Sequence, residues 1–274
     1  NLLKKLVDKR ITGIAWNYIQ DDGHIYPVVR AMGEVAGTAA ILQAAEFLSK
    51  TSDVAPGMLF GGVTGVPSTE VVILGSGSVA EYAAKAAMGL GANVKVFDNS
   101  MSRLRRLKSH TDNRLWTSII HPSELEKALE AADVVIGAMR SEFGKTPCVV
   151  TENMVQQMKA GSVIVDVSID QGGCFATSQV TTHDQPFFVY SDVAHYCVPN
   201  LASRFSKTAS QALNNIFAPL LVKLGNVGGA TKLIGQDCGF RNGVYLYRGT
   251  LTNEMLGKFY GLPSKNWDLL LPGI

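Results

Sequence analysis

The sequence predicts an α/β protein with a doubly wound Rossmann parallel sheet, flanked by part of a second α/β domain. Short apolar runs alternate with helical patterns from residue 71 to residue 167, which is typical of parallel sheets built from βαβ units. A glycine-rich turn directly follows the first of these runs. Two long helical patterns lie on either side of the alternating region, so we expect the segments beyond them to form the second domain.

The segment before the alternating region contains short elements and then a long helix. Residues 1–30 predict a short helix, a strand over 11–16 and a turn over 21–24. Residues 34–50 form a helical pattern rich in alanine, with Ile41 and Leu48 on one face. Its small side chains allow close helix packing, either in the core or at an interface between subunits.

The alternating region predicts five strands and four helices. An apolar, β-branched run that is too short for a helix indicates a buried strand. On this basis strands are expected over 71–74, 94–97, 115–120, 134–137 and 162–167, and helices over 79–89, 100–108, 123–132 and 151–158. A second long helix is expected over 203–224, followed by a loop-rich segment with a short helical pattern near 253–260.

Composition excludes several classes of protein. The 25 Lys and Arg against 23 Asp and Glu provide no broad basic surface for nucleic acid. No run of 18 apolar residues is present, so no membrane-spanning helix is expected. The four cysteines form no C-x-x-C pair and no zinc-ligand spacing, so we expect no metal site and buried reduced thiols in a cytoplasmic protein.

The strongest motif is Gly75-Ser76-Gly77-Ser78-Val79-Ala80, between the predicted strand 71–74 and the predicted helix 79–89. In that context G-x-G-x-x-G/A predicts dinucleotide binding. Gly75 permits the tight turn, Gly77 lets the backbone approach a pyrophosphate, and Ala80 permits close helix–strand packing. The pyrophosphate would lie at the helix N-terminus, where free N–H groups and the helix dipole favour an anion.

The cofactor is predicted to be NAD. Asp98 ends the second strand, where a carboxylate accepts hydrogen bonds from the adenosine ribose and repels the 2′-phosphate of NADP. The alternative is that Asp98 only caps the next helix. Arg103, Arg105 and Arg106 lie nearby, either as a solvated helix face or with one of them able to meet a 2′-phosphate.

Later strand ends supply further candidates, because doubly wound sheets bind ligands at the carboxyl ends of their strands. Ala138 and Met139 are expected to lie along the cofactor. Asp170 lies on a glycine-rich turn, where it either serves the site or only forms the turn. Asn200 offers an amide to the nicotinamide or substrate, or caps a helix. Among the histidines, His195 is the one near the predicted edge of the site.

The sequence resembles the alanine dehydrogenase family, which is related to the NAD-binding part of proton-pumping transhydrogenase. The run Ile169-Asp170-Gln171-Gly172-Gly173-Cys174 is the most specific match and favours alanine dehydrogenase. The other matching stretches are 32–37, 61–67, 72–77, 165–168, 181–183 and 195–200, and 243–253 is similar to the end of some members.

The resemblance implies roles for particular residues. Asp170 matches an aspartate that lies beside the nicotinamide and substrate and assists catalysis. Val198 and Asn200 match residues that line the cofactor. Met32 and Gly33 match a Met-Ser pair that contacts NAD, and glycine in place of serine removes one hydroxyl contact.

The resemblance also implies a domain organisation. Residues 1–30 are expected to be a remnant of the substrate domain, 31–206 the NAD-binding Rossmann domain, and 207–274 a return to the substrate domain. Family members carry further residues upstream, including the His, Lys and Arg that act on the substrate. Because residue 1 is not Met, we expect the chain to begin inside a longer protein, and these 274 residues alone to be inactive.

The expected function is therefore NAD-dependent oxidation of L-alanine to pyruvate and ammonia by a homo-oligomer, a hexamer or dimer. The sequence leaves two alternatives open. One is the NAD-binding component of a transhydrogenase, and the other is a paralogue that binds NAD without catalysis.

Overall fold

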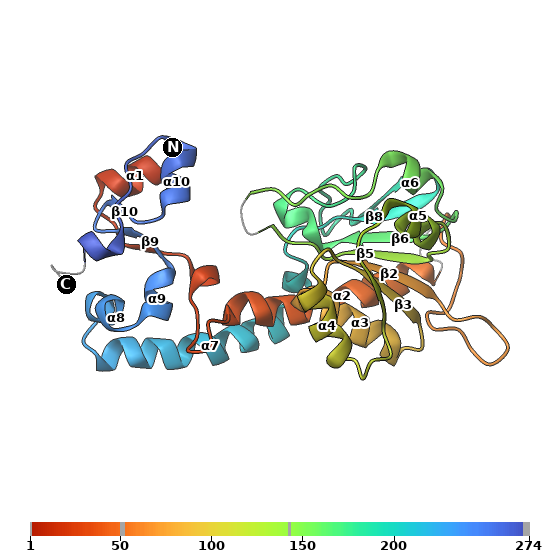
Figure 1. Cartoon of the computed structure of the whole chain (residues 1–274), viewed down its shortest axis with the longest axis horizontal. Coiled ribbons are helices and arrows are strands. Elements are labelled where there is room, and N and C mark those ends of the chain that lie inside the picture. Colours follow the sequence, from red (N-terminus) through yellow and green to blue (C-terminus); the bar gives the residue numbers. More distant parts are fainter. Residues whose placement is uncertain (1, 50–52, 142–143, 271–274) are drawn as a thin grey trace. The chain divides into compact units, whose positions relative to one another are not determined.

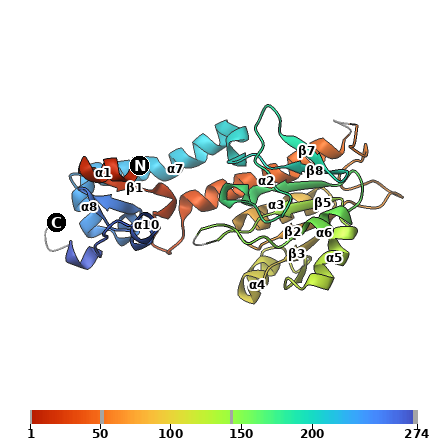
Figure 2. The same cartoon turned by 90° about the horizontal axis from the view of Figure 1, so that it is seen from above.

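The computed structural model describes residues 2–49, 53–141 and 144–270. The chain divides into two compact units, a larger one over Gly33–Ala209 and a smaller one formed by Asn1–Met32 with Ser210–Ile274 (Figures 1 and 2). The two boundaries fall inside the long helices α2 (Pro27–Leu48) and α7 (Ser206–Asn226).

The larger unit is built on a seven-stranded sheet in the order β4-β3-β2-β5-β6-β8-β7. The strands are β2 (Glu70–Leu74), β3 (Asn93–Phe97), β4 (Trp116–Ser118), β5 (Val134–Gly137), β6 (Val163–Asp166), β7 (Phe187–Tyr190) and β8 (Val193–Tyr196). All neighbours pair in parallel except β7, which lies antiparallel to β8 at the edge. The predicted α/β class with a mostly parallel sheet is confirmed.

The strand order places the carboxyl ends of the strands around one switch point. The chain moves outward from β2 through β3 to β4, and then returns to the other side of β2 to add β5, β6 and β8. This is the arrangement in which a dinucleotide binds across the crevice where the strand order reverses. The loops that follow β2, β3, β5, β6 and β8 therefore form the candidate site.

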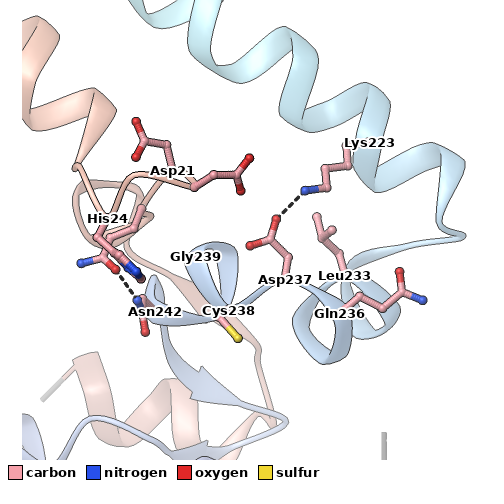
Figure 3. A pocket seen from close by; sticks show the side chains of 11 residues that line it. Asp21, His24, Lys223, Leu233, Gln236, Asp237, Cys238, Gly239 and Asn242 are labelled. Carbon is pink, nitrogen blue, oxygen red and sulfur yellow. Dashed lines mark hydrogen bonds and ion pairs between the residues drawn. The ribbon is translucent and has the colours of Figure 1, made fainter.

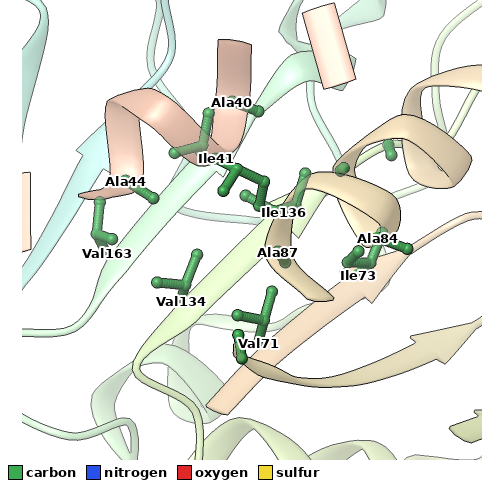
Figure 4. Close-up of a cluster of buried hydrophobic side chains, with 14 of the residues drawn as sticks. Ala40, Ile41, Ala44, Val71, Ile73, Ala84, Ala87, Val134, Ile136 and Val163 are labelled. Carbon is green, nitrogen blue, oxygen red and sulfur yellow. The ribbon is translucent and has the colours of Figure 1, made fainter. Parts of the chain in front are cut away.

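Helices cover both faces of the sheet, and an apolar cluster lies between the helices and the sheet on each face. Along the sequence, the strands alternate with α3 (Ser78–Gly89), α4 (Met101–Ser109), α5 (Pro122–Glu130) and α6 (Glu152–Gln156). Ile41 and Ala44 of α2 and Ala84 of α3 pack over strand residues such as Ile73 and Val134 (Figure 4). The opposite cluster contains Leu125 and Leu129 of α5.

The Ala-rich helix therefore has a core-packing role. Ala40, Ile41 and Ala44 are fully buried within the larger unit. A side chain at Gly37 would collide with the backbone of Val79 and Ala83, so small residues let α2 cross α3 closely. The helix begins at Pro27, seven residues before the predicted start, because proline suits the first helical position. Its predicted last residue, 50, lies outside the described residues.

The smaller unit combines both ends of the chain. It contains α1 (Leu2–Asp8), β1 (Gly13–Ile14), α8 (Ala230–Gln236), α9 (Cys238–Asn242), β9 (Val244–Tyr247), β10 (Thr250–Leu251) and α10 (Glu254–Tyr260). The strands pair antiparallel in the order β1-β9-β10. Leu3 packs with Leu246 and Leu251 in one of its two small cores.

The chain also contains the short 3-10 helices η1 (Trp16–Tyr18), η2 (Val167–Gln171), η3 (Leu201–Phe205) and η4 (Trp267–Leu269). Across the described ranges, no helix combines the length and apolar character needed to cross a lipid bilayer.

Candidate cofactor site

The turn between β2 and α3 is shaped to receive an anion. Gly75 has a φ of 108°, and a side chain there would collide with the Ala138 carbonyl, so glycine is required. At Gly77, which precedes the first residue of α3, no atom outside the neighbouring residues lies within 4 Å of the position that a Cβ would occupy. The backbone at Gly77 is therefore open to close approach, next to the N–H groups of the first turn of α3 that lack intrahelical partners. These features fit the pyrophosphate of a dinucleotide.

Ser76 and Asp98 form a pair at the ends of β2 and β3. The Ser76 hydroxyl, 1% exposed as a residue, donates to Asp98 Oδ2 at 2.7 Å. The Ser100 backbone N–H donates to Asp98 Oδ1 at 2.7 Å. Each carboxylate oxygen has two lone pairs, so Asp98 retains acceptor capacity for two ribose hydroxyls. Ser76 was predicted as part of the cofactor motif, but its bond to the Asp98 carboxylate was not predicted.

Asp98 does not cap α4 itself but bonds to the residue that does. Ser100, not Asp98, is the N-cap of α4 and accepts from the Arg103 N–H, while Asp98 holds Ser100 in place. Of the three nearby arginines, Arg106 contacts the cofactor turn, since its Nη2 donates to the Ser76 carbonyl at 3.3 Å. The cap and a ribose contact are therefore compatible.

Four predicted contact residues direct their side chains into the hydrophobic core. Ala138 and Val198 are buried in one cluster, Val79 packs against the same cluster while partly buried, and Met139 packs against the other cluster while partly buried. Any contact that Ala138 and Val198 make with a cofactor would therefore come mainly from their backbone. The Ala138 N–H donates to the Leu74 carbonyl at 2.8 Å, which joins the ends of β2 and β5 at the switch point.

Asp166 is a buried carboxylate at the end of β6 that the sequence analysis did not identify. Its Oδ1 accepts from the Ser168 N–H at 3.0 Å, and its Oδ2 accepts from the Cys174 N–H at 3.0 Å and the Ser178 hydroxyl at 2.7 Å. Burial raises the pKa of this carboxyl, although these donors oppose the shift. A charged residue within the apolar run 162–167 was the signal that could have revealed it.

Asp166 shapes the loop that carries Asp170. The loop forms η2 and then a left-handed turn with Gly172 at φ 98° and Gly173 at φ 82°. A side chain at Gly173 would lie 2.6 Å from Asp166 Oδ2, so glycine there also leaves room for the carboxylate. The loop is thus folded around a buried carboxyl group.

The structure brings Asp170 and Asn200 together. Asp170 is exposed, and its Oδ1 accepts from the Asn200 backbone N–H at 2.8 Å. Asn200 has a left-handed conformation, with φ 54° and ψ 50°, and makes no side-chain cap bond to η3. Its side chain is therefore not a helix cap, and Asp170 links the ends of β6 and β8.

His195 and Met32, two further residues that the sequence predicted near the site, lie on β8 and α2 rather than in the loops at the strand ends. His195 is fully buried on β8, where its Nδ1 lies 3.0 Å from the Val193 carbonyl and its Nε2 lies 2.8 Å from Thr177 Oγ1. Burial lowers the pKa of His195, which indicates a neutral structural imidazole. Met32 lies on α2 in the range of the smaller unit, so its contact with the cofactor stays a prediction.

A separate cavity of about 330 Å³ lies in the smaller unit, with none of the predicted site residues in its lining (Figure 3). Lys223 Nζ lies 2.7 Å from Asp237 Oδ2 at its edge. The Asp237 Oδ1 accepts from the Phe240 N–H and caps α9. This ion pair joins α7 to the α8–α9 segment, and the lining of the cavity also contains Asp21, Asp22 and His24.

The sequence is similar to those of known alanine dehydrogenases. Residues 40–254 match the family model described as alanine dehydrogenase/PNT, C-terminal domain. The alanine dehydrogenase of Staphylococcus haemolyticus is 38% identical over 262 residues, which cover 95% of this chain and 70% of that protein. The alanine dehydrogenase of Halomonas elongata is also 38% identical, with 96% and 70% covered.

Two solved structures have a similar fold. A structure titled L-alanine dehydrogenase has a TM-score of 0.88 and 36% identity, and the match covers 95% of this chain and 71% of that one. A transhydrogenase from Sinorhizobium meliloti has a TM-score of 0.71 and 19% identity, with 91% and 68% covered. At 19% identity the second comparison supports the fold alone.

Proposed function

The chain belongs to the alanine dehydrogenase/PNT family, and from this premise we propose that it binds NAD and serves the NAD-dependent oxidative deamination of L-alanine to pyruvate and ammonia. The observation that carries the proposal is the convergence of Gly75, Gly77, Asp98, Asp170 and Asn200 at one edge of the doubly wound sheet. These residues follow strands on both sides of the switch point, as a two-part cofactor requires.

The adenosine half of NAD would lie at the ends of β2 and β3. The first turn of α3 would hold the pyrophosphate through backbone N–H groups. Asp98 would accept from the ribose hydroxyls, and Ser76 would keep its carboxylate oriented. Because a 2′-phosphate would meet this carboxylate, NAD is preferred to NADP.

The nicotinamide half would lie at the ends of β5, β6 and β8, among Ala138, Met139, Asp170, Val198 and Asn200. Bound NAD would supply the hydride acceptor, so the chain's own task is to orient and stabilise. Asp170 is exposed at this edge, and its carboxylate would stabilise the positive charge that develops on the amino-acid nitrogen. The Asn200 N–H holds that carboxylate in a defined position.

The family also includes transhydrogenases, but the relatives at 36–38% identity are named alanine dehydrogenases. This difference favours the deamination. We further propose a cytoplasmic homo-oligomer, and assignment of the smaller unit to a substrate domain, as the family resemblance implies.

The proposal is tested by titrating NAD and NADP against the wild-type chain and Asp98→Ala. We expect NAD affinity to fall about tenfold or more, because hydrogen bonds to a charged group contribute about 1.5–3 kcal/mol. The affinity for NADP should fall by less, so the ratio of NAD affinity to NADP affinity should decrease. Asp184→Ala, at an exposed aspartate of the same unit, is the matched control. An unchanged NAD/NADP preference would leave Asp98 as support for a helix cap only.

A further inference from the structure

Two adjacent residues after β6 contact the neighbouring strand ends on both sides. Asp170 reaches toward β8 through the Asn200 N–H. Gln171 reaches in the other direction, toward the residues that follow β5. Since β6 lies between β5 and β8 in the sheet, this dipeptide is placed to hold three strand-end segments in one arrangement.

The contact of Gln171 is a paired one. Its Oε1 accepts from the Ser141 backbone N–H at 3.1 Å, and its Nε2 donates to the Ser141 carbonyl at 3.2 Å. The Gln171 carbonyl also accepts from the Thr146 N–H at 2.9 Å. A side-chain amide that satisfies both main-chain groups of one residue fixes the orientation of that residue, which a single bond would not do.

The position of Ser141 gives this pairing a consequence for the cofactor. Ser141 comes two residues after Met139, in the segment that follows β5. The adenosine contacts around Asp98 follow β3, on the other side of β2. The Gln171 pairing therefore acts on the nicotinamide half of the site and not on the adenosine half.

We propose that Gln171 is a positioning residue for the nicotinamide half of the cofactor, through its paired hydrogen bonds to the Ser141 backbone. The inference rests on the proposed NAD binding. Gln171 need not touch the cofactor, because its role is to hold the backbone after β5 against the turn that carries Asp170. Loss of the pairing should weaken the binding of a ligand only to the extent that the ligand uses the nicotinamide half.

The test compares NAD with ADP-ribose, which lacks the nicotinamide ring, by calorimetric titration of the full chain. Gln171→Met keeps the unbranched length of the side chain and removes both hydrogen bonds. Gln171→Glu keeps the acceptor for the Ser141 N–H but places a carboxylate oxygen against the Ser141 carbonyl. Gln156→Met is the matched control, since Gln156 is exposed on α6 and its Nε2 donates to the Tyr190 hydroxyl at 3.2 Å.

For Gln171→Met we expect the Kd of NAD to rise about tenfold, and that of ADP-ribose to change by less than about twofold. Gln171→Glu should shift the ratio of the two Kd values in the same direction, and it carries the comparison if the Met variant fails to fold. Gln156→Met should leave the ratio unchanged. Equal weakening of both ligands would indicate a structural role only and overturn the inference. A wild-type chain that binds neither ligand would overturn the proposed function and this inference together.

Discussion

Replacement of Asp166 by Asn tests whether a buried carboxylate holds the loop that carries Asp170. Asn matches Asp in shape but keeps only one acceptor oxygen. Three backbone and hydroxyl donors surround the two carboxylate oxygens, at 2.7–3.0 Å. In its better orientation the amide oxygen would replace Oδ2 and keep the Cys174 and Ser178 bonds. The amide NH₂ would then face the Ser168 N–H, and two donors would oppose each other.

The expected cost is about 2 kcal/mol at neutral pH. A hydrogen bond to a charged acceptor contributes about 1.5–3 kcal/mol, and a buried donor left unsatisfied costs about 1–3 kcal/mol. Relief from burying the charge offsets part of this sum, because burial raises the pKa of Asp166. For a domain of this size the melting temperature should fall by about 4–8 °C.

The assay is urea and thermal unfolding of the larger unit. Trp116 on β4 is the single tryptophan among residues 33–209, so its fluorescence in a Trp16→Phe, Trp267→Phe background reports that unit. Asp184→Asn, at an exposed site, should change stability by less than about 0.5 kcal/mol. If Asp166→Asn is as stable as that control, the carboxylate does not hold the loop.

The pH dependence gives a second readout of the same change. The ordinary pKa of an aspartate is 3.8, and the pKa of Asp166 in the folded chain lies above it. At a pH between 3.8 and this raised pKa, the native chain therefore binds more protons than the unfolded chain. Stability of the wild type relative to Asp166→Asn should therefore increase as the pH falls through the raised pKa toward 3.8. A penalty that shrinks over this range would contradict the assigned direction.

Two other substitutions test the site and the sheet. Asp170→Asn can keep the bond from the Asn200 N–H, so the affinity for NAD should stay near that of the wild type. The kcat of an alanine-oxidising form of the protein should fall about 10²-fold or more, because the negative charge is lost. Near-normal turnover would show that Asp170 has no catalytic role. Burial lowers the pKa of His195, so wild-type stability should fall as the pH decreases from 6.5 toward that lower pKa, because the unfolded chain binds the proton more readily. His195→Gln should lose this slope in a series of unfolding curves, and a retained slope would assign it to another group.

Local sequence patterns predicted most of the strands and helices of the larger unit. The β-branched runs at 71–74 and 134–137 became β2 and β5 with bounds that agree within one residue. Such runs are reliable because strands buried on both faces need continuous apolar sequence. The strands β9 and β10 of the smaller unit were not predicted, because β9 pairs with β1 at the other end of the chain and no local pattern reveals that pairing.

For the site, the amino-acid sequence was enough to identify the residues at strand ends: Gly75, Asp98, Asp170 and Asn200 all follow apolar runs, and the chemistry of a glycine turn and a strand-end carboxylate is local. The contacts among these residues depend on the folded arrangement of the strands. The hydroxyl of Ser76 bonds to Asp98, Asp170 bonds to the Asn200 backbone, and each pair joins residues 22 or 30 positions apart. Strand order brings such residues into contact, and no spacing along the chain reveals it, because parallel neighbours in a sheet are separated by whole crossover connections.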